Sequence, residues 1–327
     1  MRAPSYTYWI QSDKSNCSLR AIRRMVDLKP QRHGEIFIDC SAIEPFQSYL
    51  KTKADEDLDR LASTPGGRLA YQHHRWSSAS PRLTIREFWK QQLKRITWSE
   101  QLENSIATII RLLGNREKYW LDATLKYLPE EHVFNTMIYL IGGYDSVVYG
   151  ENVTLNLNSR QFHRDHREAV YYLIHELAHA GYFRYRRMPK LSGLMTRHRL
   201  VETVKLLTHL EGMGVISSFH QRVKQGGLLD PDYQVLLNEK ETNRRVREYF
   251  SKLQNIQKST NSKRHKLGYS RLDEFSAKPR RLWYVAGGHM ALKIEQECGR
   301  PRLQEIVRTG SEEFFGTYLQ IENPLTL

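Results

Sequence analysis

Apolar residues recur at helical spacing in the middle of the chain. One buried face of a helix is indicated by apolar side chains at i, i+3, i+4, i+7 and i+8, and the positions that fit are Val170, Leu173, Ile174, Leu177 and Ala178. The neighbouring stripe carries Tyr172, His175, Glu176 and His179. The pattern therefore predicts a buried helix whose polar stripe borders the core. Asp165 followed by Glu168 resembles the start of this helix, and Gly181 suits its end.

Similar periodicity predicts helices along much of the rest of the chain. The segments are 84–128, interrupted at Gly114-Asn115, about 194–222, about 231–255, and a group of closing helices from Leu282 onward. A short helical pattern also lies around 19–26. Two segments have the composition of loops: 51–81, with Pro65-Gly66-Gly67, and 258–281, which is basic and rich in Ser and Asn.

Three segments have the apolar pattern of β-strands. They are 34–40, 137–142 and 151–158, with a turn at 143–146. In the last strand, Thr154, Asn156 and Asn158 share a polar face. That face is compatible with a sheet edge near the polar helix stripe, where an extended peptide could bind by main-chain hydrogen bonds, and equally with a plain half-buried strand.

Length and composition are those of a globular protein. The 327 residues are 40% hydrophobic and 11% aromatic, enough to bury a substantial core. Cys17, Cys40 and Cys298 are odd in number and far apart, which argues against disulfides and against a Cys-x-x-Cys zinc site. No segment approaches the roughly 18 apolar residues of a membrane span, and no apolar run follows Met1-Arg2 as in a secretory signal. We therefore expect a cytoplasmic protein with no membrane partner.

The formal charge is +14, from 50 Lys and Arg against 36 Asp and Glu. This excess is compatible with nucleic-acid binding, with acidic substrates and with a solvated basic surface. The basic stretches 184–190 and 258–281 are the candidates for nucleic-acid contact, but no helix-turn-helix, zinc-finger or RNA-binding signature accompanies them. A solvated basic surface is therefore the favoured interpretation.

His175-Glu176-x-x-His179 lies on the polar stripe of the predicted helix. Imidazoles four residues apart are one helical turn apart, so both can reach a single Zn²⁺ at about 2.0–2.1 Å. Glu176 lies one step round the helix, outside that coordination sphere, where it can accept a proton from a water on the metal. The motif also arises by chance on solvated helix faces. Apolar flanks and a third ligand downstream favour one zinc ion per chain.

Glu211 is the best candidate for the third ligand. It lies on a face of the predicted helix 194–222 whose other members are Leu200, Val204, Leu207, Val215 and Ser218. An acidic side chain on such a face is costly to bury unless it is paired or binds a metal. Gly212 and Gly214 follow Glu211 and would let this helix approach the metal-binding helix closely.

Glu202 is the rival candidate. It shares a helix face with His198, Lys205 and His209. Because Lys205 in their midst would repel a cation, this face is predicted to be solvated. A structural zinc site usually has four protein ligands, and His198 or His209 could supply the fourth only if this face turned inward.

Together these motifs resemble the gluzincin group of zinc metallopeptidases. The resemblance rests on His175-Glu176-x-x-His179 with Glu211 in Leu210-Glu-Gly-Met213. More narrowly, the segment 152–318 resembles uncharacterised families described as zinc-dependent peptidases. The matching pieces are Thr154-Leu-Asn-Leu-Asn158, the Glu-Gly pair, Tyr284-Val-Ala-Gly287, Gly299 and Phe314.

The resemblance implies that His175, His179 and Glu211 are the ligands, that a water takes the fourth position and that Glu176 is the general base. It also implies a zincin-like fold, with a small, mainly antiparallel sheet packed on the metal-binding helix. Many gluzincins place an Asp four residues after the glutamate ligand to orient a histidine. This chain has Val215 there, so another group must orient the histidine.

The oxyanion that forms when a carbonyl is attacked needs a hydrogen-bond donor. Tyr284 is the first candidate and His289 the second, because both lie in the closing segment, which related enzymes fold over the cleft. A packed core tyrosine and a histidine on a helix surface are equally compatible with the sequence.

We therefore expect an α+β, mostly helical protein. Residues 1–33 would form an N-terminal extension, 34–150 a helical region that contributes strands, and 151–327 the catalytic region, although 34–327 could equally be one domain. The predicted function is zinc-dependent hydrolysis of peptide bonds in peptide or protein substrates. The alternatives are a basic nucleic-acid-binding protein with a structural zinc site, and a catalytically silent relative that serves as a binding platform.

Overall fold

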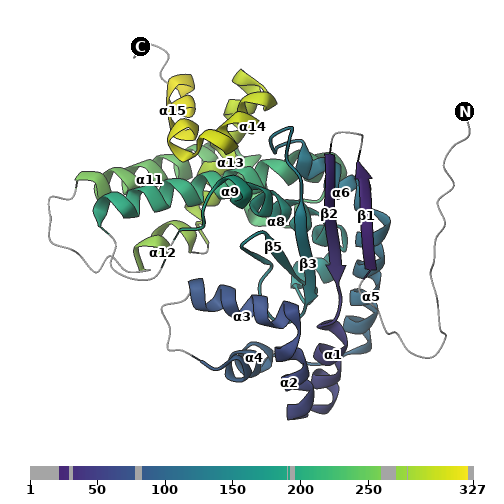
Figure 1. Ribbon diagram of the computed structural model, residues 1–327. Helices are drawn as coiled ribbons and strands as arrows, with labels where there is room; N and C mark the ends of the chain where they lie inside the picture. Colours follow the sequence, from purple (N-terminus) through teal and green to yellow (C-terminus); the bar gives the residue numbers. More distant parts are fainter. Residues whose placement is uncertain are drawn as a thin grey trace, which may run out of the picture.

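The computed structural model describes residues 22–28, 32–77, 83–189, 191, 196–258, 270–277 and 279–322. Within these residues one five-stranded sheet packs against helices, and a second group of helices lies beyond the helix that carries His175 (Figure 1). A mostly helical α+β protein is therefore confirmed. None of the helices in the described part is both long and apolar enough to cross a membrane.

The sheet has the strand order β1-β2-β3-β5-β4. The strands are β1 (Ile22–Leu28), β2 (Arg32–Asp39), β3 (Asn135–Ile141), β5 (Asn152–Asn156) and β4 (Val147–Tyr149). β2, β3 and β5 are parallel to one another, whereas the outer strands β1 and β4 are antiparallel to their neighbours. The sheet is mixed, so the expectation of a mainly antiparallel sheet is wrong. Parallel neighbours need a long crossover connection, and the segment between β2 and β3 provides one.

Two expectations about the strands need correction. The helical pattern around 19–26 is wrong where the structure describes it, because Ile22–Leu28 is a strand paired with β2; a short apolar run does not separate helix from strand, and pairing decides. β5 is not a sheet edge, since β3 and β4 pair with its two sides. β3 and β5 also pair across position 150, so the two regions predicted on either side of it share one sheet.

The described residues between β2 and β3 contain α1 (Ile43–Thr52), α2 (Asp55–Ser63), α3 (Pro65–Ser77), α4 (Ile85–Leu93), α5 (Glu100–Asn115) and α6 (Glu117–Leu125). The last three confirm the helices predicted over 84–128. The loop predicted over 51–81 is wrong, because α2 and α3 occupy it as far as Ser77. Pro65 begins α3, where its missing N–H needs no partner. Gly66 brings α3 onto β3, since an added Cβ there would lie 2.9 Å from Tyr139 Cβ.

After β5 come α7 (Arg160–Arg164), α8 (Arg167–Tyr185), α9 (Arg197–Gln225), α10 (Pro231–Leu236), α11 (Glu239–Lys258), α12 (Ser270–Ser276), α13 (Leu282–Cys298), α14 (Arg300–Thr309) and α15 (Ser311–Glu322). The helix predicted over 194–222 and the closing helices are confirmed. The helix predicted over 231–255 is divided into α10 and α11. Part of the loop predicted over 258–281 is α12, and residues 259–269 lie outside the described residues.

α8 continues beyond its expected end at Gly181 as far as Tyr185. Gly181 instead makes room for Leu128, whose Cδ1 would lie 2.3 Å from an added Cβ. This glycine therefore marks a close approach of side chains and not the end of a helix.

α8 lies between the sheet and α9 (Figure 1), and two hydrophobic cores meet at it. The first core joins the sheet and the helices before α8 to the apolar stripe of α8 itself, including Leu173 and Leu177. The second core joins α9 to helices α11–α15. In it, α9 and α13 pack closely at Gly212, where an added Cβ would lie 2.6 Å from the Gly287 carbonyl oxygen. α8 therefore contacts both halves of the molecule.

Candidate metal centre

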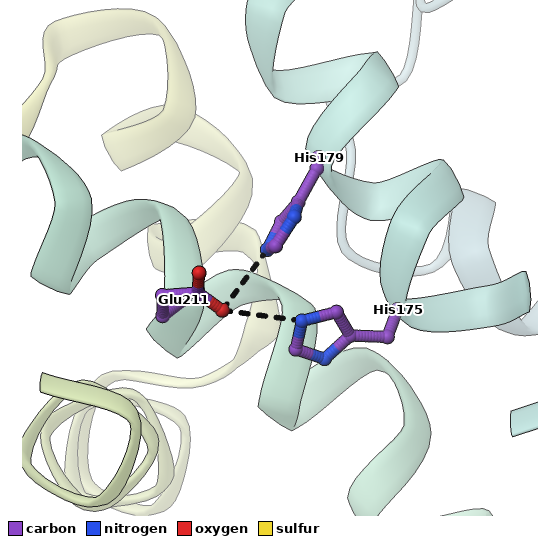
Figure 2. Close-up of side chains that lie close together, drawn as sticks. All are labelled: His175, His179 and Glu211. Carbon is purple, nitrogen blue, oxygen red and sulfur yellow. Dashed lines mark hydrogen bonds and ion pairs between the residues drawn. The ribbon is translucent and has the colours of Figure 1, made fainter. Parts of the chain in front are cut away.

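Two helices bring together three side chains that could bind a metal ion. His175 and His179 project from consecutive turns of α8, and Glu211 projects towards them from α9 (Figure 2). Glu211 Oε2 lies 3.2 Å from His175 Nε2 and 3.5 Å from His179 Nε2. The three side chains predicted as ligands thus converge, although they come from segments 36 residues apart.

These spacings fit one tetrahedral zinc ion. Ligands at about 2.0–2.1 Å from a tetrahedral ion lie about 3.3 Å from one another. The two N···O distances of 3.2 and 3.5 Å bracket that separation, and all three ligand atoms lie within 4.8 Å of one another. Two imidazole nitrogens and one carboxylate oxygen leave a fourth position open, which is typical of catalytic zinc sites. Elsewhere in the described part of the chain no other such group of His, Cys, Asp and Glu occurs.

Gly214 keeps the space beside the histidine nitrogens free. An added Cβ at this position would lie 2.6 Å from His179 Nε2 and 2.8 Å from His175 Nε2. His179 Nε2 is itself buried without a hydrogen-bond partner among the described residues, as expected of a nitrogen that is meant for a metal. The close approach predicted for Gly214 is confirmed, whereas Gly212 packs against α13.

Burial keeps both histidines in the neutral form that binds metal. It lowers the pKa of His175 to about 3 and also lowers the pKa of His179. Burial raises the pKa of Glu211, while His179, Arg281 and a hydrogen bond from Tyr284 lower it. A divalent cation would compensate the negative charge of this buried carboxylate.

Glu176 lies beside the cluster without belonging to it. Its carboxylate Oε2 is 3.7 Å from His179 Nδ1, the nitrogen on the far side of that ring from Glu211. Burial raises the pKa of Glu176 to about 8; His175 opposes the rise, and Glu211 and Asp145 add to it. A buried carboxyl group with a raised pKa, next to a metal-binding cluster, is a candidate for a general base.

Tyr233 of α10 supplies the hydrogen-bond partner for His175 that Val215 cannot provide. The Tyr233 hydroxyl lies 3.4 Å from His175 Nδ1 and 2.7 Å from Ser218 Oγ. When Nδ1–H donates to this hydroxyl, Nε2 is left unprotonated and directed at Glu211. Val215 packs against the Tyr233 ring instead. No local pattern in the sequence points to Tyr233, because α10 is separated from α8 in the chain by the whole of α9.

The structure brings Tyr284 to the cluster and leaves His289 away from it. Tyr284 lies close enough to Glu211 to lower the pKa of that carboxyl group, and burial raises the pKa of the Tyr284 hydroxyl far above its usual value, so the hydroxyl keeps its proton. His289 lies farther along α13 against Tyr318 of α15, with ring centroids 5.9 Å apart. Burial lowers the pKa of His289, and the negative charge of Glu322 opposes that shift.

The rival face of α9 is divided between surface and core. His198 and Glu202 lie 3.2 Å apart with side chains 84% and 56% exposed, so this pair is solvated as predicted. The prediction is wrong for His209, which is fully buried, stacks on Phe314 and lies 3.0 Å from the Tyr182 hydroxyl. The phenyl ring of α15 covers a position that the helix periodicity placed outside. Neither histidine joins the metal-binding cluster.

Two arginines of the basic stretch 184–190 are engaged within the molecule. Arg184 forms an ion pair with Glu151 at 3.2 Å, and Arg186 donates to the Val307 carbonyl at 3.1 Å. Half of the other basic stretch, 258–281, lies outside the described residues. Nucleic-acid binding therefore stays a prediction, and nothing in the described residues adds to it.

Comparison with known proteins gives one match. Residues 58–323 match the model of a family described as "Putative zinc dependent peptidase (DUF5700)", a range that includes His175, His179 and Glu211. No curated protein and no solved structure matches the chain.

Proposed function

The chain belongs to this family, and from that premise we propose that it hydrolyses peptide bonds at a zinc centre formed by His175, His179 and Glu211, with Glu176 as general base. The observation that carries the proposal is the tetrahedral spacing of three ligand atoms with a further carboxylate beside them. A structural zinc site would close the fourth position with protein, and among the described residues no fourth His, Cys, Asp or Glu joins this cluster.

Each side chain then has a distinct task. Zn²⁺ bound at the cluster supplies a Lewis acid that polarises the scissile carbonyl and acidifies a water. Glu176 takes the proton of the attacking water as the new C–O bond forms. It delivers that proton to the amine nitrogen as the C–N bond breaks. A cation held by His175, His179 and Glu211 would favour the carboxylate form of Glu176, which burial otherwise disfavours, and that form could act as the base.

Tyr284 is the proposed donor to the developing oxyanion. Its protonated hydroxyl acts on the pKa of Glu211 and therefore lies near the cluster. A neutral donor preplaced in a buried site stabilises charge that appears only in the transition state. We do not assign this task to His289, because its ring packs against Tyr318.

The strand β4 is the proposed binding edge for substrate. It pairs with β5 on one side, and on its other side it pairs with no strand among the described residues. Asp145, just before β4, acts on the pKa of Glu176, so this end of the strand lies near the proposed base. An extended peptide could add to the free edge through main-chain hydrogen bonds.

The test combines zinc content with cleavage of a peptide library. We expect Glu176→Gln to keep one zinc per chain and to lower the rate of cleavage by about 10²–10⁴-fold, because only the base is removed. We expect Glu211→Ala to lose zinc, because one of three ligands is removed. Metal content is measured by inductively coupled plasma mass spectrometry and cleavage by mass spectrometry of the library.

Glu202→Gln is the matched control, since it changes an exposed glutamate on the same helix as Glu211. It should leave zinc content and cleavage unchanged. Full turnover by Glu176→Gln would contradict its role as base, and undiminished zinc in Glu211→Ala would contradict the ligand set.

A further inference from the structure

Arg281 is held in an unusual backbone conformation immediately before α13. Its φ of 40° lies in the left-handed region, which is unfavourable for a residue with a side chain. The preceding turn is fixed by Arg245, whose guanidinium donates to the carbonyls of Pro279 and Arg280 at 3.2 and 2.6 Å. The backbone N–H of Arg281 donates to the Ala277 carbonyl at 3.0 Å. Strain of this kind persists where the surroundings require one orientation of the side chain.

That orientation places the guanidinium beside the metal centre. Its Cζ lies 3.6 Å from the centroid of the Tyr284 ring, and Nε lies 2.5 Å from Asp232 Oδ2. Asp232 directly precedes Tyr233, whose hydroxyl lies 3.4 Å from His175 Nδ1. Tyr284, under the guanidinium, lies close enough to Glu211 to lower the pKa of that carboxyl group. Arg281 is therefore separated from the ligands by one tyrosine side chain on either path.

A permanent cation near a site for a divalent cation is electrostatically unfavourable by itself. Zinc binding therefore does not explain why an arginine lies beside the metal centre. The ion pair between Arg281 and Asp232 does not explain it either, because such a pair does not need to lie beside a metal centre. The Arg281 side chain is 26% exposed, whereas that of Asp232 is 6% exposed. Asp232 thus holds the guanidinium from the buried side and leaves another side of it open.

We propose that Arg281 binds a carboxylate of the substrate, close to the scissile bond. This inference rests on the proposed peptidase function and adds a substrate class to it, namely peptides with a carboxylate near the cleaved bond. A guanidinium matches a carboxylate with two parallel hydrogen bonds, and one that is already held in place binds with little loss of side-chain freedom. Consecutive α-carbons are about 3.8 Å apart, so a carboxylate one residue from the scissile carbonyl falls within the distance that one tyrosine ring spans.

Two kinds of carboxylate share this chemistry, the C-terminal carboxylate and an acidic side chain. The test uses the full chain with Glu176→Gln, loaded with zinc, so that binding is measured without turnover. Dansyl-labelled tripeptide pools of apolar residues are prepared as free acids and as C-terminal amides. A third pool has a C-terminal amide and Glu as the last residue. Affinity is measured by fluorescence anisotropy.

We expect the free-acid pool to bind at least tenfold more tightly than the apolar amide pool. Adding Arg281→Met should abolish that difference by weakening the free acids and leaving the amides unchanged, and Arg281→Lys should restore it in part. Arg280→Met is the matched control, because Arg280 is the adjacent arginine, more than half exposed and paired with Glu248. It should keep the full difference.

Tight binding of the Glu-amide pool that depends on Arg281 would support the site and identify a side chain as the source of the carboxylate. Equal affinity for all three pools, a difference that survives Arg281→Met, or no binding of any pool would overturn the proposal. The test distinguishes failure of the carboxylate site from failure of the proposed peptidase function. A protein that cleaves no peptide but still distinguishes acid from amide keeps the carboxylate site, and one that cleaves peptides but binds acid and amide equally loses only this site.

Discussion

Two arginines lie in the polar interior near the metal centre, and their surroundings differ. Arg222 of α9 is 1% exposed and pairs with Glu168, which is 0% exposed. Its guanidinium carbon lies 4.1–5.4 Å from three ring centroids, those of Tyr171, Tyr172 and Tyr233. Arg281 is 26% exposed, pairs with Asp232 and lies over one ring, that of Tyr284.

The difference separates a structural charge from an available one. The guanidinium of Arg222 is enclosed by aromatic rings and a buried carboxylate, so solvent and ligands have no access to it. Its contact with Tyr233 also supports the hydroxyl that holds His175. Arg281 also contacts an aromatic ring and a carboxylate, but one side of its guanidinium is left open. We therefore expect Arg222 to matter for folding and Arg281 for binding.

The largest effect is expected for Arg222→Met. Removing one partner of a buried ion pair leaves Glu168 uncompensated, which destabilises the fold by about 3–5 kcal/mol. The double variant Glu168→Gln/Arg222→Met should lose less than Arg222→Met alone, because no buried charge remains. The free energy of unfolding in urea measures both. Arg244→Met, which breaks an exposed pair with Glu241, is the control and should lose little stability. If Arg222→Met lost equally little, the distinction between the two regions would be removed.

Tyr233→Phe should have the next largest effect, and on zinc. Without the hydroxyl, His175 Nδ1 has no partner to fix its tautomer, so we expect zinc affinity to fall by about 10–100-fold. Competition with a chelator of known affinity measures the change. Tyr249→Phe removes another buried hydroxyl against α9, at 2.7 Å from Thr208 Oγ1, and should leave the affinity unchanged. Equal zinc affinity in the two variants would show that Tyr233 does not orient the ligand.

The smallest effect is the change in stability caused by Arg281→Met, and it should depend on pH. Burial raises the pKa of Asp232 to about 6, and Arg281 opposes the rise. A carboxyl group whose folded pKa lies above its unfolded value of about 3.9 destabilises the fold as pH rises through that interval. The variant should therefore lose little stability at pH 4 and about 1–2 kcal/mol at pH 7.5. Urea unfolding at both pH values tests this, and a loss of the same size at both would show that the Asp232 pair is not its cause.

The sequence predicted the parts of the fold that depend on short-range periodicity. The helices over 84–128 and 194–222 and the closing helices follow from apolar spacing, and so does the helix that carries His175. Segments whose structure depends on partners were predicted wrongly. β1 is a strand because β2 pairs with it, and α3 is a helix because its two glycines fit against Tyr139 and the Leu61 carbonyl.

Glycine was the least reliable signal for the same reason. Gly181 looked like a helix end, but it accommodates Leu128 within α8, whereas Gly214 does face the histidine nitrogens as expected. A missing side chain can serve a backbone turn or a close contact. The sequence states only that the side chain is absent, and the neighbours that make this useful come from other elements.

The sequence by itself determined which residues could bind the metal. The helical repeat alone brings the imidazoles of His175 and His179 together, and an acidic residue on an apolar face identified Glu211 as the third candidate ligand. Only the tertiary structure decided what surrounds them. Tyr233, Arg281 and Tyr284 reach the centre because α13 packs against α9 and α10 packs against α13. The spacing within a helix is local, whereas these contacts arise from packing between segments distant in the chain.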